Sequence, residues 1–78
     1  MKVLAFGIIK EIFNDAEASI AIKNGDRVDL LKNILEEKYP RLKELGSYMI
    51  AVNNEYASAD DIIHDNDEVA IIPPVSGG

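Results

Sequence analysis

Residues 26–38, DRVDLLKNILEEK, carry the clearest helical pattern in this chain of 78 residues. Apolar side chains recur there at spacings of three and four, which places them on one stripe of a helix: Val28, Leu31, Ile34 and Leu35. We expect Asp26 to cap the helix by accepting a hydrogen bond from the N–H of Asp29. Because the residue before a proline disfavours the α conformation, Pro40 should end the helix near Lys38. The chain therefore has one main helix, whose apolar stripe needs a second layer.

Short apolar segments on both sides of this helix supply that layer as strands. Alternation and β-branched residues predict five of them, with a single helical turn after the first, at residues 2–9, 18–22, 48–52, 55–57 and 68–72. One helix packed across one face of a mixed sheet of about five strands is an α+β fold of the ubiquitin-like, β-grasp type. We assign residues 1–72 to this domain and expect residues 73–78 to protrude as a flexible, extended C-terminal tail.

The size and composition of the chain limit its function. A single domain of this length has little room for a deep active site, which favours a subunit, a carrier or an interaction module over a self-sufficient enzyme. Without cysteine there is no thiolate nucleophile and no zinc–sulfur site. No apolar run approaches the length of about 20 residues that spans a bilayer, so we expect a cytoplasmic protein without a membrane partner.

The net charge of −6 is distributed unevenly along the sequence. Residues 1–39 are nearly balanced, whereas residues 40–78 contain two basic and seven acidic residues. Such a chain repels phosphate backbones and is not expected to bind nucleic acid. A basic protein partner that meets the C-terminal half would be attracted. Ordinary solubility charge is the alternative explanation.

The first and last predicted strands are apolar on both faces, although a single helix can cover only one face. In the first strand Leu4 and Phe6 point to one face, and the apolar residues between them point to the other. In the last strand Ile72 points to one face and Ile71 to the other. A strand with one solvated face should alternate apolar with polar residues. One explanation is that loops partly cover these strands. The other is a flat apolar patch, including Phe6, Tyr56 and Ile72, that a partner covers.

Side chains suited to catalysis are scarce. The single histidine, His64, lies in a polar turn and is expected to be a solvated surface residue. The acidic residues at 60–68 lack the ligand spacing of a calcium loop, and no glycine-rich phosphate loop is present. We therefore predict neither a metal site nor a bound cofactor.

The remaining candidate for chemistry is the segment Pro73-Pro74-Val75-Ser76-Gly77-Gly78. The two prolines end the last strand and stiffen the exit from it, and the residues from Val75 to Gly77 form a slender approach. Gly-Gly can enter a narrow channel, where the main-chain carboxylate of Gly78 could be activated. On composition alone, such an end is as well explained by fraying.

The sequence resembles the small subunit family of molybdopterin synthase over nearly its whole length. The residues that carry the resemblance are Asp67-Glu68-Val69-Ala70-Ile71-Ile72-Pro73-Pro74-Val75-Ser76-Gly77-Gly78, together with Ala51-Val52-Asn53 and the opening Lys2-Val3-Leu4-Ala5-Phe6-Gly7 followed by Lys10-Glu11. The resemblance implies a β-grasp sulfur carrier. Gly-Gly alone is not specific, but the ending that includes both prolines is.

The resemblance also implies a mechanism and partners. A ubiquitin-activating-like adenylyltransferase would use ATP to adenylate Gly78, which becomes a thiocarboxylate. That group would donate sulfur to a pterin precursor inside the large subunit of a 2+2 heterotetramer, so the chain is not an enzyme on its own. The partner interface of the family falls on Phe6, Lys10, Tyr56, Ile72, Pro73 and Pro74. The family often has arginine at Lys10 and two phenylalanines at residues 71–72.

Other roles are compatible with the same residues. Carriers for thiamine or tRNA thiolation and protein modifiers use the same carboxylate chemistry. An interaction module without any carrier role would not need Gly77 and Gly78.

Overall fold

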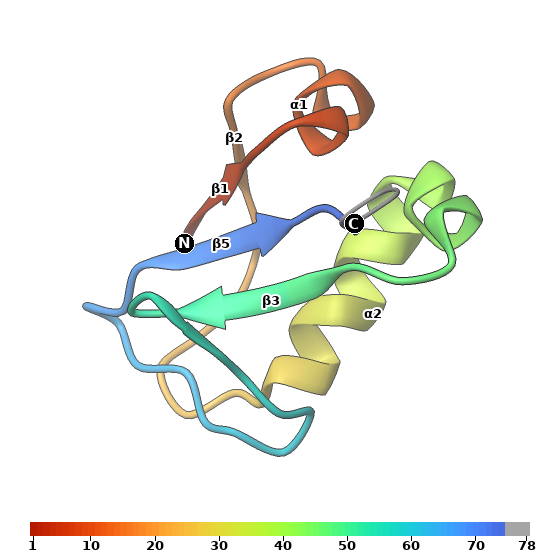
Figure 1. Ribbon diagram of the computed structural model, residues 1–78. Coiled ribbons are helices and arrows are strands. Elements are labelled where there is room, and N and C mark those ends of the chain that lie inside the picture. Colours follow the sequence, from red (N-terminus) through yellow and green to blue (C-terminus); the bar gives the residue numbers. More distant parts are fainter. Residues whose placement is uncertain (75–78) are drawn as a thin grey trace.

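The computed structural model describes residues 1–74 as a five-stranded mixed sheet with one main helix across one face (Figure 1). In chain order the elements are β1 (Lys2–Ala5), α1 (Ile8–Phe13), β2 (Glu17–Ser19), α2 (Val28–Lys38), the 3-10 helix η1 (Pro40–Leu45), β3 (Met49–Val52), β4 (Glu55–Tyr56) and β5 (Val69–Ile72). The strand order is β2-β1-β5-β3-β4, and only the central pair, β1 and β5, is parallel. The predicted fold class is confirmed.

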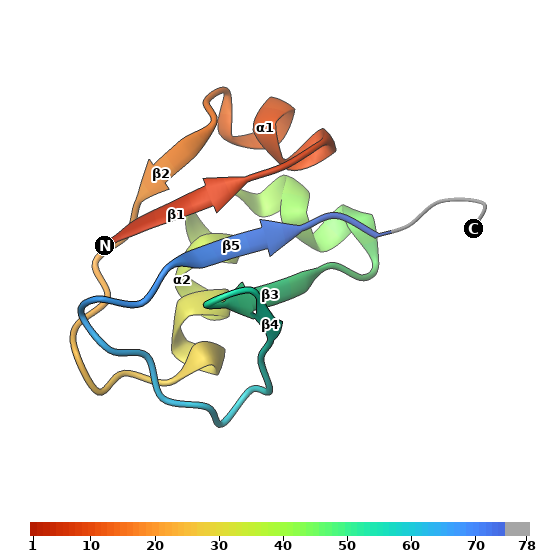
Figure 2. The ribbon, with the colours of Figure 1, turned by 60° about the vertical axis from the view of Figure 1, so that its left-hand side comes forward.

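The core lies between the sheet and α2 (Figure 2). The sheet contributes Val3, Val69 and Ile71, which are fully buried, and α2 contributes the equally buried Leu31 and Leu35. The stripe predicted from the helical spacing is therefore the face that packs. No polar or charged residue is buried among residues 1–74. Apolar burial of this kind, at about 25 cal/mol per Å², is the main force that holds the helix on the sheet.

The predicted first strand, residues 2–9, is too long. β1 ends at Ala5, and Gly7 then adopts φ 55° and ψ −130°. The carbonyl of Phe6 accepts a hydrogen bond from the N–H of Ile9 at 3.0 Å, which closes a tight turn with Gly7 in its first central position. Glycine suits this position because it has no Cβ atom to oppose a positive φ. The turn starts α1, a six-residue helix in place of the single helical turn predicted after the first strand.

The predicted N-cap of α2 is also wrong. The N-cap residue is Arg27, and the Asp26 carboxylate instead accepts a hydrogen bond from the N–H of Lys23 at 2.9 Å. The free N–H groups at the helix start donate to carbonyls of a distant loop: Val28 to Asp61 and Asp29 to Ala59, both at 2.9 Å. Main-chain carbonyls thus replace the expected side-chain cap.

The remaining boundaries differ by a few residues. β2 covers residues 17–19 rather than 18–22, and the final strand begins at residue 69 rather than 68. The fourth strand ends at Tyr56, one residue earlier than predicted. Leu42 is fully buried on η1, as expected for a segment that packs against the core.

Candidate partner-binding site

The face of the sheet opposite α2 has no helix over it (Figures 1 and 2). On β1 and β5 the alternation is strict: Leu4, Ala70 and Ile72 are half-buried on this face. The register aligns Leu4 with Ala70 and Ala70 with Ala51. Ala51 is in turn the neighbour of Tyr56 on β4. One row of this open face therefore crosses four strands without a charged side chain.

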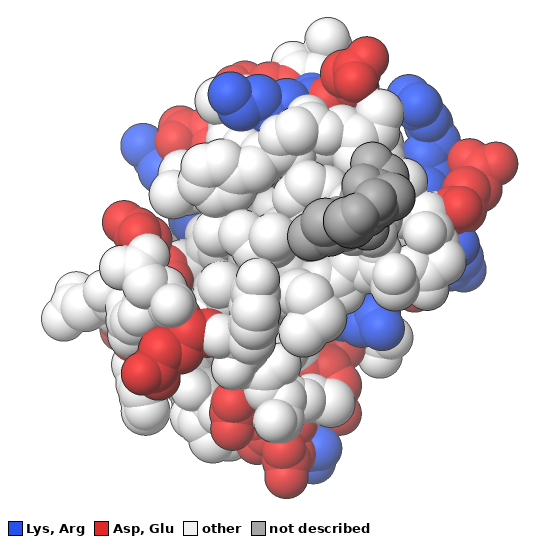
Figure 3. Space-filling model, in the orientation of Figure 1, with Lys and Arg blue, Asp and Glu red and all other residues white. Residues whose placement is uncertain are grey.

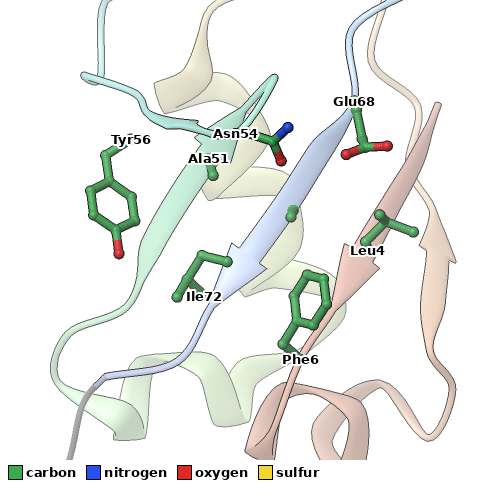
Figure 4. A pocket seen from close by; sticks show the side chains of 8 residues that line it. Leu4, Phe6, Ala51, Asn54, Tyr56, Glu68 and Ile72 are labelled. Carbon is green, nitrogen blue, oxygen red and sulfur yellow. The ribbon is translucent and has the colours of Figure 1, made fainter.

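This row contains a hollow with a volume of about 270 Å³. It is lined by Leu4, Phe6, Ala51, Asn54, Tyr56, Glu68, Ala70 and Ile72 (Figure 4). The hollow exists because two alanines lie side by side in its floor, while larger side chains stand around them. Phe6 is 45% exposed and Tyr56 is 67% exposed, so both present ring surface to solvent. The structure thus brings together Phe6, Tyr56 and Ile72, which the sequence had predicted to share an apolar patch.

One end of the hollow is polar. Glu68 and Asn54 lie at the start of β5 and the β3–β4 turn, at the opposite end from Phe6 and Ile72 (Figure 4). Glu68 is the only charged residue that lines the hollow, and its carboxylate is exposed and has no ion pair within residues 1–74. The whole face has the same distribution of charge as the hollow: its centre is uncharged, and acidic side chains lie along its lower margin (Figure 3).

The main chain at Glu68 is held in place by a network of hydrogen bonds between two turns. The Asn53 side chain accepts the N–H of Glu68 at 3.0 Å and donates to the Asp67 carboxylate at 2.9 Å. The other oxygen of Asp67 accepts the N–H of His64 at 2.8 Å. These contacts, first that with His64 and then that with Asn53, lower the pKa of Asp67. Asn53 and Asp67, two residues of the recognised motif, therefore fix the polar end of the hollow.

The residues that follow β5 begin beside the opposite end of the hollow. Pro73 is half-buried and packs near Gly7, and Pro74 is exposed. Lys10 is exposed on α1 and is not among the residues that line the hollow, so its interface role stays a prediction. The predicted carrier position Gly78 and its approach, residues 75–77, lie outside the described residues.

Sequence reasoning had not assigned Leu4, Ala51, Asn54, Glu68 or Ala70 to the site. Leu4 and Ala70 share the alternation of Phe6 and Ile72, so that signal was available. The pairing of Ala51 with Ala70 depends on the β3–β5 register, which the alternation alone does not give.

No group of three histidine or acidic residues among the described residues is arranged to hold a metal ion. None of the helices described is long and apolar enough to cross a membrane.

Comparisons with known proteins match the whole chain. The sequence model of the ThiS family matches residues 3–78. A molybdopterin synthase sulfur carrier subunit from Mycobacterium tuberculosis is 36% identical over 80 residues, which cover 100% of this chain and 96% of that protein.

Two solved structures extend the comparison. A putative molybdopterin converting factor subunit 1 from Pyrococcus furiosus superposes with a TM-score of 0.82 at 29% identity, over 95% of each chain. A complex of subunits 1 and 2 of the molybdopterin-converting factor from Helicobacter pylori contains a chain that matches with a TM-score of 0.69 at 29% identity, over 99% of this chain and 96% of that one.

Proposed function

This chain belongs to the ThiS family, among the sulfur carrier subunits of molybdopterin synthase, and we propose that it carries sulfur as a thiocarboxylate on Gly78. Its place is in the biosynthesis of the molybdenum cofactor. The family model extends through Gly78, which supports this position as the carrier group. The observation on which the proposal depends most is the course of β5, which passes along the apolar hollow and leads directly into Pro73 and Pro74.

That course links recognition to delivery. Ile72 lines the hollow, and the two prolines follow it without an intervening loop. Because proline fixes φ and donates no ladder hydrogen bond, the chain leaves the sheet at this point. A partner seated on Phe6, Tyr56 and Ile72 would therefore receive the residues after Pro74 close to its own surface. Residues 75–77, which are small or slender, suit entry into a narrow channel.

The chemistry takes place on the main chain. The Gly78 carboxylate attacks the α-phosphate of ATP, which gives an acyl adenylate and releases pyrophosphate. A sulfide-level sulfur nucleophile then displaces AMP and leaves a thiocarboxylate. In the last step the sulfur passes to a pterin precursor, and oxygen from water restores the carboxylate. This chain contributes the reacting group and the docking surface, and its partners contribute the acids, bases and nucleotide contacts.

The proposal includes two partners. The large subunit of molybdopterin synthase receives the loaded chain, in a 2+2 heterotetramer. The complex of subunits 1 and 2 solved for the Helicobacter pylori protein supports the pairing with that subunit. A ubiquitin-activating-like adenylyltransferase loads the chain and uses ATP to do so.

Intact-mass measurement tests the carrier role. The chain is incubated with its activating enzyme, ATP and a sulfur source, and one oxygen at Gly78 should be replaced by sulfur. A variant with one alanine added after Gly78 is the control, since the displaced carboxylate should not load while thermal stability stays unchanged. If no cognate activating enzyme forms an adenylate with the chain, the carrier role is wrong. Sulfur transfer to a pterin rather than a thiazole precursor distinguishes the molybdopterin role from the thiamine role.

A further inference from the structure

We propose that the hollow on the open face receives an arginine or lysine side chain of the large subunit, with the cation bound by Glu68. The aliphatic part of that side chain would lie on Ala51 and Ala70. This inference rests on the proposed function, because it specifies what the partner must present to this surface. It goes beyond an apolar contact, since it assigns a charge and a position to the group that enters.

The shape of the hollow favours a long, thin side chain. Its floor is made by Ala51 and Ala70, which are direct neighbours in the β3–β5 register. Leu4 on β1 and Tyr56 on β4 are the next residues in the same row, one on each side, and both are larger. The result is a trough about 270 Å³ in volume that runs along β5 from Ile72 toward Glu68 (Figure 4).

The position of the negative charge in the hollow determines the orientation of the guest side chain. Glu68 closes the trough with the only carboxylate in its lining, and Asn54 adds a side-chain oxygen at the same end (Figure 4). The main chain of Glu68 is fixed to Asn53 by hydrogen bonds in both directions, at 2.8 and 3.0 Å. The main chain that carries this carboxylate is therefore fixed, and no basic residue within residues 1–74 forms an ion pair with it.

A purely apolar guest would fit this hollow poorly. It would cover the Glu68 carboxylate and remove it from water without giving it a partner, which is costly. Arginine and lysine avoid that cost, because their methylene stems pack on apolar surface while the cation stays at the polar end. The charge-assisted hydrogen bond that results is about twice as strong as a neutral one. The acidic character of residues 40–78 would attract the same basic group before contact.

Binding of the large subunit to variants of this chain, measured by isothermal titration calorimetry at low and physiological salt, tests the proposal. Glu68→Gln should weaken binding by about tenfold, and Glu68→Lys by about 100-fold, with most of the loss in the charge-dependent part at low salt. Glu37→Gln and Glu37→Lys are matched controls, because Glu37 is exposed on α2, on the other side of the sheet, and gives the same changes in net charge. These controls should bind like the wild type.

Filling the hollow tests its shape independently. Ala70→Leu should weaken binding by about tenfold at both salt concentrations, whereas Ala70→Ser, which adds little volume, should have a small effect. The melting temperature of each variant shows that the fold is intact. A second measurement identifies the guest: one Arg→Glu or Lys→Glu reversal in the large subunit should restore binding to the Glu68→Lys variant.

The outcomes separate this inference from the carrier role. If the wild-type chain loads sulfur and binds the large subunit, but the Glu68 variants bind as well as the Glu37 variants, the proposed guest is wrong and the carrier role stands. If no charge reversal in the large subunit restores binding, the guest is not a cation. If the wild-type chain neither loads nor binds, the proposed function itself fails.

Discussion

Gly7 and Pro73 approach each other so closely that a Cβ atom added to Gly7 would lie 3.1 Å from the Cγ atom of Pro73. The two residues come from opposite ends of the chain and meet because β1 and β5 run parallel at the centre of the sheet. Gly7 also follows Phe6, whose ring lines the hollow. The turn at Gly7 thus helps to determine the positions of both Phe6, a predicted interface residue, and Pro73, the first residue after β5.

Gly7→Val should impair loading of Gly78 as well as stability. A β-branched residue at φ 55° costs about 1–3 kcal/mol, and its side chain would push on the Pro73 ring. The chain leaving β5 would then point in another direction. We expect a lower kcat/KM for adenylation by the activating enzyme and a lower melting temperature, both measured on the purified variant.

Gly25→Val is the matched control for this change. Gly25 also has a positive φ, 96°, but a Cβ atom there would meet nothing within 4 Å. It should lose stability and keep its loading rate. Combining Gly7→Val with Pro73→Ala, which removes the crowded Cγ atom, should recover part of the lost rate. If both glycine variants load equally well, contact with Pro73 does not position the segment.

Phe6→Asp should weaken the complex with the large subunit by at least about 2 kcal/mol, because it places a charge in an apolar contact. Leu30→Asp is a close control: Leu30 is 41% exposed on α2, against 45% for Phe6, but it lies away from the open face. Calorimetry should show a loss of affinity for the first variant alone. Equal affinities with an intact fold would move the interface elsewhere.

The sequence predicted those parts of the fold that depend on apolar residues repeating at short, regular spacings. The stripe that includes Leu31 and Leu35 repeats every three to four residues, so the buried face of α2 was predictable. The alternation on β1 and β5 predicted that Phe6 and Ile72 share a face for the same reason. The turn at Gly7 was missed because residues 2–9 form one apolar run, in which a single glycine was the only sign of a break.

Features that depend on distant parts of the chain were not predictable. The carbonyls that receive the first N–H groups of α2 belong to Ala59 and Asp61, about 30 residues further on. The floor of the hollow depends on the pairing of Ala51 with Ala70, two residues that show no local signal. The interface role of Lys10 came from family resemblance alone and stays a prediction, since Lys10 lies on α1 and is not among the residues that line the hollow.

Asp67→Asn should destabilise the chain at neutral pH and have less effect in acid. The pKa of Asp67 is lowered by the N–H of His64 and then by the Asn53 side chain. A lowered folded-state pKa means that the carboxylate stabilises the fold above the ordinary pKa of aspartate, and that this contribution is lost as the pH falls through the lowered value. Thermal melts should therefore show a gap between wild type and variant at neutral pH that narrows in acid.

Asp60→Asn serves as the control for Asp67→Asn. Asp60 is exposed in the same acidic loop, and its substitution removes the same charge. Its melting temperature should stay close to that of the wild type at every pH. If the difference in melting temperature between wild type and Asp67→Asn persists unchanged in acid, the lost stability does not depend on the charge of the carboxylate.

Tyr48→Phe should cost about 1 kcal/mol at neutral pH and make the chain less sensitive to alkali. The Tyr48 hydroxyl donates a hydrogen bond to the Glu36 carboxylate on α2, and this bond ties the segment just before β3 to the helix. Burial first, and then this hydrogen bond, raise the pKa of Tyr48. A raised folded-state pKa means that unfolded chains lose the proton first, so this stabilisation declines as the pH rises above about 10. Denaturant unfolding at increasing pH should therefore show the wild type approaching the variant, because phenylalanine has no proton to lose. If the difference in unfolding free energy stays constant above that pH, neither burial nor the bond to Glu36 retains the Tyr48 proton in the folded chain.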